Sequence, residues 1–180
     1  MYTNAKYQSL NNEINGIINL IRFTCLEELN CFGNNIEKII NIPNTIKKIR
    51  CSKNKLLFID NLPESVEELV CNENMLTVLN NLPNSLETLT CGENSIQFLD
   101  NLPRYLKMLN CVNNSITRLD NLPDTLQVLI CYHNQLSSLD NLPNSLIKMS
   151  CMGNQIESLD CLPIGLKILD CNRKIGRAHV

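Results

Sequence analysis

The strongest constraint on this chain is an internal repeat of 20 residues. Cysteine recurs at this interval from Cys31 to Cys171 without an insertion or a deletion. All seven prolines and a column of asparagines keep the same interval, each in its own register. The asparagine column runs from Asn34 to Asn154. A tandem repeat of this kind predicts a solenoid, in which each unit buries one face against its neighbours.

The unit that ends at Pro103 shows how the residues of one repeat are used. It reads Leu-x-x-Leu-x-Cys-x-x-Asn-x-Ile from Leu86 to Ile96. Residues 88–92 alternate between outward and inward side chains, which predicts a short strand. Leu102-Pro103 favours an extended, polyproline-like return, because proline fixes its own φ and disfavours helix in the residue before it. Stacked units therefore predict parallel strands in register, about 4.8 Å apart, with little helix.

This pattern resembles the leucine-rich repeat, in the short class that carries Leu-Pro in its variable half. The resemblance covers residues 26–171. Bacterial type III effectors carry this class, and similar cysteine-bearing repeats occur in giant viruses of amoebae and in bacteria. The resemblance implies a right-handed leucine-rich-repeat solenoid with a parallel β-sheet on the concave face and an extended convex side. It also implies a protein–protein interaction module.

Two other functions remain open at this stage. One alternative is that the chain is the substrate-recognition part of a larger, ubiquitin-ligase-like effector enzyme. The catalytic domain of that enzyme would be absent from this fragment. A surface-adhesion repeat is the third alternative, but it requires export, and the start of the chain lacks the apolar stretch of a secretory signal. We expect a cytoplasmic protein, delivered into a host cell if it is an effector.

The repeated polar columns have structural interpretations. A buried asparagine must be hydrogen-bonded, and its amide can bridge the backbones of successive turns. The cysteine column is predicted to be a ladder of buried, reduced thiols. Disulfides and a metal site are the alternatives, but parallel side chains keep Cβ atoms farther apart than a disulfide prefers, and a linear ladder does not form a tetrahedral site. Cys25 and Cys161 lie outside the column and are expected to have no role.

A column of aspartates also recurs before the Leu-Pro pair. Stacked carboxylates can bind Ca²⁺, whereas single aspartates commonly shape turns by accepting backbone N–H bonds. The second interpretation is favoured, because no glycine-rich loop accompanies the column. The column consists of Asp60, Asp100, Asp120, Asp140 and Asp160.

The sequence gives little support for catalysis or for ligands other than protein. The two histidines, His133 and His179, lie in no nucleophile-elbow context, and no glycine-rich phosphate loop is present. We therefore expect no enzymatic activity, no cofactor and no bound metal. The net charge of −2 gives no electrostatic footprint for nucleic acid, and no apolar run is long enough to span a membrane. A monomer is expected.

The residues predicted to point out of the sheet change character along the chain. The first repeats carry mixed polar and charged residues there, such as Glu28, Lys48 and Arg50. Later repeats carry an apolar cluster, and contiguous apolar surface often marks an interaction site. High β-propensity is the alternative explanation for valine, isoleucine and tyrosine at such positions. The candidate partner-binding residues are Met108, Val112, Val128, Ile130, Tyr132 and Met152.

The two ends depart from the repeat. Residues 1–21 are predicted to form an N-terminal cap, with a helix over residues 8–21, because apolar residues recur there at helical spacing. A membrane-binding helix is disfavoured, because Lys6 is the only cation before Arg22. Residues 22–173 are assigned to about seven to eight repeats. Residues 174–180 resemble the translation of a DNA adapter used in short-read sequencing libraries. They are therefore expected to be non-native, and the natural chain is expected to continue past about residue 173.

Overall fold

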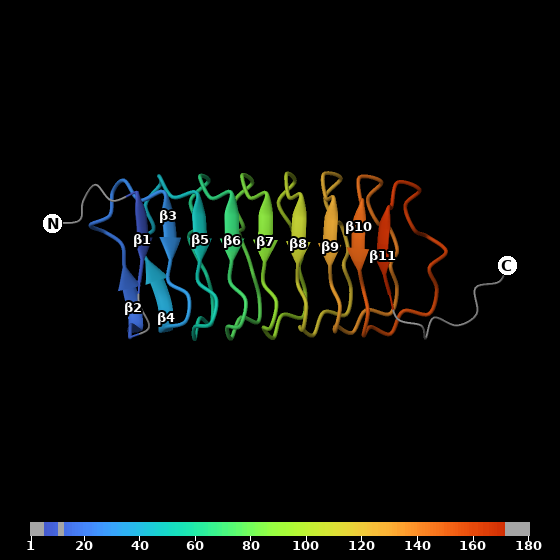
Figure 1. The fold of residues 1–180 in the computed structure, drawn as a ribbon, viewed down its shortest axis with the longest axis horizontal. Coiled ribbons are helices and arrows are strands. Elements are labelled where there is room, and N and C mark those ends of the chain that lie inside the picture. The colour runs from blue at the N-terminus through green and yellow to red at the C-terminus, as the bar shows by residue number, and fades with distance from the viewer. Residues whose placement is uncertain (1–5, 11–12, 172–180) are drawn as a thin grey trace.

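The computed structural model describes residues 6–10 and 13–171, and it shows a β-solenoid of about eight turns (Figure 1). Nine short strands form one parallel sheet that runs the length of the molecule. They are β1 (Tyr7–Ser9), β3 (Glu28–Asn30), β5 (Lys48–Arg50), β6 (Glu68–Val70), β7 (Thr88–Thr90), β8 (Met108–Asn110), β9 (Val128–Ile130), β10 (Lys148–Ser150) and β11 (Ile168–Asp170). A second parallel pair contains β2 (Asn15–Asn19) and β4 (Asn35–Ile40). The described residues contain no helix.

The strand register follows the sequence period. Leu89 in β7 lies opposite Leu69 in β6 and Leu109 in β8. The same 20-residue offset relates all neighbouring strands from β3 to β11. The predicted in-register parallel sheet is therefore confirmed.

The core lies between the sheet and the extended return segments. Within one repeat Leu86, Leu89, Cys91 and Ile96 are fully buried, and Leu99 is 3% exposed. Equivalent side chains of neighbouring repeats continue this core along the whole stack. Burial of each such leucine contributes roughly 1.5–3 kcal/mol to the free energy of unfolding. Because this burial occurs only when repeats stack on one another, a single repeat is not stable without its neighbours.

The return segment contains no helix, as Leu-Pro predicted. A turn follows the proline, since the N–H of Leu106 donates to the carbonyl of Pro103 at 3.0 Å. The asparagine two residues before each of six prolines has a left-handed backbone; Asn101, for example, has φ of 58°. Asparagine tolerates this conformation better than most residues, because its short polar side chain bonds locally. This accounts for the Asn-Leu-Pro triplet.

The asparagine column forms a hydrogen-bond ladder between repeats. Nδ2 of Asn94 donates to the carbonyl of Cys91 in its own repeat and to that of Cys71 in the preceding repeat, each at 3.1 Å. Oδ1 of Asn94 accepts from the N–H of Leu76 at 3.0 Å. The predicted bridging role is confirmed. The same three bonds recur at Asn54, Asn74, Asn114, Asn134 and Asn154.

A second ladder, which the repeat pattern did not predict, uses hydroxyl groups. Oγ of Ser85 donates to the carbonyl of Val66 at 2.7 Å, so it also joins one repeat to the one before it. Tyr105 and Gly165 interrupt this column. Equivalent bonds come from Thr45, Ser65, Thr125 and Ser145.

The predicted N-terminal helix is wrong. The segment instead forms β1 and β2, which pair with β3 and β4 as an irregular first turn. Gly16 has φ of 77°, which interrupts a helix, while Ile17 and Ile21 are exposed. Buried Ile18 and Leu20 follow a two-residue spacing instead. Strands also provide hydrogen-bond partners for the backbone groups at the edge of the next repeat, which a capping helix would leave unpaired. The predicted adapter-derived tail lies outside the described residues.

The asparagine ladder makes a prediction about stability. Asn94→Ala removes an acceptor for one backbone N–H and a donor to three carbonyl groups, so we expect it to cost about 1–3 kcal/mol in the free energy of unfolding. Asn84→Ala, at an exposed asparagine in the same repeat, is the control and should cost less than about 0.5 kcal/mol. Urea unfolding measures both, and equal midpoints for the two variants would contradict a bridging role.

Candidate sheet-face interaction site

The outward residues of the strands form one continuous surface, here called the sheet face. It comprises the first and third residues of β3 and β5–β11 and the second residue after each strand. On β6 to β9 the first and third residues are half-buried, while the middle residue is fully buried. The predicted alternation is therefore confirmed, and the outward side chains are less constrained by core packing than the inward ones.

The structure brings the six predicted site residues together on this face. Met108 lies opposite Val128, and Ile130 lies beside them on β9. Tyr132 and Met152 follow β9 and β10, and both are half-buried. Val112 differs, because only 7% of it is exposed. A Cβ placed on Gly92 would lie 2.7 Å from Cγ2 of Val112, so the valine occupies space that a glycine leaves open. Sequence alone did not reveal this packing.

The charged residues at the N-terminal end of the sheet face pair with one another. Glu28 on β3 lies 3.4 Å from Lys48 and 3.8 Å from Arg50 on β5. The other terminal nitrogen of Arg50 lies 2.8 Å from Glu68 on β6. This network leaves little unpaired charge for a partner to contact.

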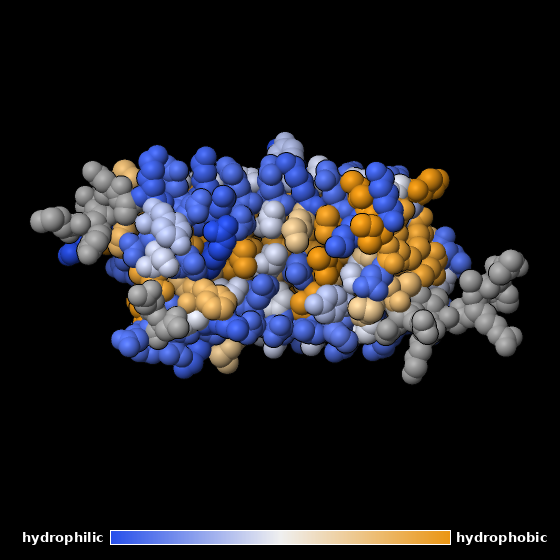
Figure 2. Space-filling view, viewed as in Figure 1, coloured by the Kyte–Doolittle hydropathy of each residue, from blue (hydrophilic) through white to orange (hydrophobic). Residues whose placement is uncertain are grey.

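The C-terminal end of the sheet face has a different character. The sheet-face positions of β8 and β9 carry no charged residue. Lys148 on β10 and Asp170 on β11 are charged but have no ion pair within the described residues. Figure 2 shows hydrophobic colour gathering toward the β9–β11 end and hydrophilic colour near β3–β5. Apolar side chains are thus more numerous on the β8–β11 part of the sheet face, although Phe32, after β3, is also exposed.

The cysteine ladder is buried behind the sheet. All seven cysteines from Cys31 to Cys151 are buried and unpaired. Burial raises the pKa of Cys31 and Cys91 to about 12, and it raises the pKa of Cys151 to about 11. The four ladder cysteines between these have pKa values raised well above the ordinary value by the same desolvation. Such thiols pack as small apolar groups and are poor nucleophiles.

The aspartate column lies in the return segments, just before the Leu-Pro pair, and its side chains are exposed. Where the structure pairs these carboxylates, the partner is a side chain. Arg118 lies 3.9 Å from Asp100 and 3.3 Å from Asp120. Among the residues that the structure describes, no three histidine, cysteine or acidic side chains gather as metal ligands do.

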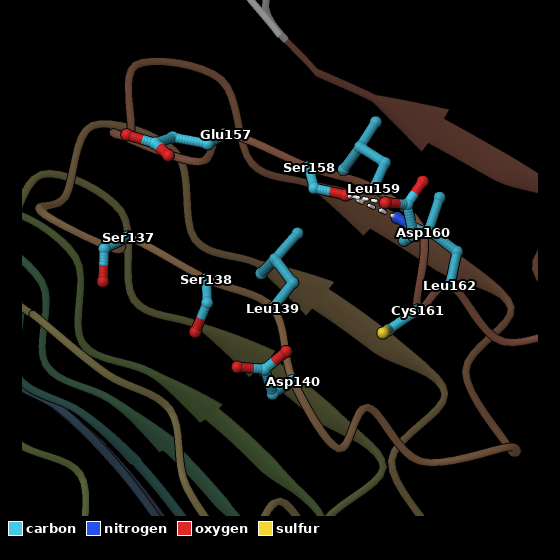
Figure 3. Close-up of a pocket in the computed structure, with 10 residues that line it drawn as sticks. All are labelled: Ser137, Ser138, Leu139, Asp140, Glu157, Ser158, Leu159, Asp160, Cys161 and Leu162. Atoms are coloured by element: carbon cyan, nitrogen blue, oxygen red, sulfur yellow. Dashed lines mark hydrogen bonds between the residues drawn. The ribbon is translucent and has the colours of Figure 1, made fainter. Parts of the chain in front are cut away.

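A shallow pocket of about 130 Å³ lies between the loops that follow β9 and β10 (Figure 3). Its lining includes the off-column Cys161 and three carboxylates. Oγ of Ser158 donates to Oδ2 of Asp160 at 2.6 Å. No cation or histidine lines this pocket, whereas reactive cysteines normally lie beside such groups. The pocket therefore offers no recognisable catalytic arrangement.

No helix in the described part of the chain has the length and apolar character needed to cross a bilayer.

The fold and its ladders define a parallel β-solenoid with interlocked repeats, and comparison with known proteins identifies its class. No protein-family profile matches the chain, and no curated protein matches it by sequence. Solved structures do match. YopM from Yersinia enterocolitica WA-314 aligns with a TM-score of 0.76 and 29% identity, over 83% of this chain and 38% of YopM.

Two further structures share the architecture. A leucine-rich-repeat domain of a Shigella effector aligns with a TM-score of 0.68 and 30% identity, over 75% of this chain and 63% of that domain. The functional domain of InlJ from Listeria monocytogenes, which includes a cysteine ladder, aligns with a TM-score of 0.69 and 25% identity, over 87% of this chain and 41% of that one. This chain is therefore a leucine-rich-repeat protein with a cysteine ladder. It spans less than two thirds of the length of each of these relatives.

The buried thiols make stability depend on alkaline pH. Their folded-state pKa values lie above the ordinary value of 9.0. Below that pH both states keep the thiols protonated, but above it the unfolded chain loses protons first, so the free energy of unfolding falls as pH rises. We expect the urea midpoint to drop between about pH 9 and pH 11. Replacing the exposed pair, Cys25→Ser with Cys161→Ser, should leave the drop unchanged, whereas Cys91→Val should make it shallower. An unchanged drop in Cys91→Val would contradict this origin.

Proposed function

We propose that this chain is a protein-binding module that holds a partner on the C-terminal half of its sheet face. Ile130 and Tyr132 are the anchors, and Met108, Val128 and Met152 surround them. The observation that carries this proposal is the contrast along the face. Charges at β3–β6 neutralise one another, while half-buried apolar side chains at β8–β10 lack a covering layer. Apolar surface of this kind is where partner burial gives most free energy.

The local geometry supports Tyr132 as an anchor. Its ring meets the ring of His133 edge to face, with centroids 5.3 Å apart. His133 has φ of 54°, and its ring occupies space over Gly153, where a Cβ would meet Nδ1. The tyrosine ring therefore contacts an exposed histidine whose own ring lies against Gly153. An aromatic side chain restrained before binding loses less conformational entropy when the partner arrives.

A protein partner also fits the electrostatics better than nucleic acid does. The net charge is −2, and Arg50, the arginine on the sheet face, is already paired with two glutamates. Phosphate backbones need unpaired cations along their path. Buried thiols suit a reducing compartment, so we place the protein in a cytoplasm, either its own or that of a host.

The second candidate function is substrate recognition within a larger effector enzyme. The similarity to the leucine-rich-repeat domain of a Shigella effector favours it, because that repeat domain belongs to an effector protein. The sheet face would then select the substrate, and chemistry would come from another domain. Both candidates assign the same binding surface to this chain.

The double variant Ile130→Ser/Tyr132→Ser tests the proposed surface. It removes both apolar anchors but leaves the buried leucine of β9 in place, so we expect at least a tenfold loss of binding with little change in stability. The readout is capture of proteins from a eukaryotic lysate by the immobilised chain, together with a melting curve.

A matched control changes the same repeat positions in the charged half of the face. Phe32→Ser/Val70→Ser should keep partner capture, because Phe32 lies after β3 and Val70 lies on β6. The proposal is overturned if the anchor variant still captures its partner, or if both double variants lose capture equally.

A further inference from the structure

Hydrogen-bond donors without acceptors surround the apolar anchors. In the position two residues after each strand, the backbone N–H takes no part in the sheet. A side chain accepts it in several repeats; the N–H of Gly92, for example, donates to Oδ1 of Asn72 at 2.7 Å. The equivalent N–H groups of Tyr132 and Met152 have no acceptor among the described residues. Both lie inside the proposed binding surface.

Asn110 adds an oriented donor to the same surface. It is half-buried on β8, opposite Thr90 and Ile130. Its Oδ1 accepts the N–H of Val112 at 3.3 Å, and this bond fixes which way the amide faces. Nδ2 is therefore the free end, and it has no acceptor within the described part of the chain. An amide held in this way presents two N–H groups beside an apolar anchor.

The chemistry of an occupant follows from this arrangement. Donors at Asn110, Tyr132 and Met152 require acceptors, and apolar side chains lie between them. The nearby charges, Lys148 and Asp170, have opposite signs, so the region is close to neutral. A strongly acidic ligand gains little over a neutral one there. Main-chain carbonyl groups are neutral acceptors, and in an extended segment they alternate with side chains that can reach an apolar surface.

We infer that the partner contacts this surface with an extended, uncharged polypeptide segment, whose main-chain carbonyl oxygen accepts a hydrogen bond from Nδ2 of Asn110 while a neighbouring apolar side chain contacts Ile130 and Tyr132. This inference rests on the proposed function and specifies the partner's chemistry. Asn110 is thereby a specificity-determining residue rather than part of the core.

The test replaces the donor without disturbing the local bond. In Asn110→Asp the carboxylate still accepts the N–H of Val112, but it presents an acceptor in place of Nδ2. Asn30→Asp is the matched control, because Oδ1 of Asn30 accepts the N–H of Phe32 at 3.2 Å in the same way, at the charged end of the face. The probe is a set of dodecapeptides selected on the whole chain from a random phage-displayed library, then synthesised and measured by fluorescence polarisation.

The expected result is that selected peptides share an apolar residue and bind Asn110→Asp at least about tenfold more weakly, while they bind Asn30→Asp as tightly as the unmodified chain. Equal binding to Asn110→Asp overturns the inference. If Ile130→Ser/Tyr132→Ser nevertheless abolishes binding of those same peptides, the proposed function stands, although the role assigned to Asn110 does not. Failure to select any peptide, or binding unaffected by either change, contradicts both.

Salt dependence separates the two kinds of acceptor. A carbonyl acceptor predicts affinity that changes less than about twofold as ionic strength rises, because no charge pair is formed. Affinity that falls steeply with salt, and that is also lost in Lys148→Ser, would identify a partner carboxylate and overturn the assignment to main-chain carbonyl groups.

Discussion

The asparagine ladder is the interaction on which the rest of this structure depends. Each amide joins the carbonyl groups of two successive cysteines and an N–H of the preceding repeat, as Asn94 does for Cys71, Cys91 and Leu76. A short repeat has too few residues for helices that satisfy their own backbones, so side chains must satisfy the tight turn after each strand. One inserted residue would move an amide away from its partners. This explains why the period holds without interruption from Cys31 to Cys171.

A backbone fixed in this way leaves the sheet face free to vary. Inward residues such as Leu89 and Cys91 are fully buried and constrained by packing, whereas most outward residues are half-buried. The two halves of the face use this freedom differently. Glu28, Arg50 and Glu68 neutralise one another at one end, while apolar side chains are more numerous at the other. The repeat thus provides a rigid frame, and in the proposed function the outward side chains provide selectivity.

Much of this architecture could be predicted from sequence because it rests on periodic residues. The strand around Leu89, the buried thiols and the bridging role of Asn94 follow from period and residue chemistry. The N-terminal helix was wrong, because isoleucines at helical spacing also fit strands once Gly16 adopts a positive φ. The hydroxyl ladder was missed, since Ser85 resembles an ordinary turn residue. Burial of Val112 depends on the missing side chain of Gly92, a contact between repeats that no single-repeat pattern reveals. The binding role of the six candidate residues stays a prediction.

Amide hydrogen exchange is the most direct test of the ladder. The N–H groups of Leu76, Ile96 and Ile116 donate to asparagine side chains of the following repeat. If these bonds hold the repeats together, the three amides should exchange as slowly as that of Leu89 in the central sheet, opening only when several repeats unfold together. Exchange as fast as that of an exposed loop residue such as Thr77 would show that the sheet and core, not the asparagines, carry the connection between repeats.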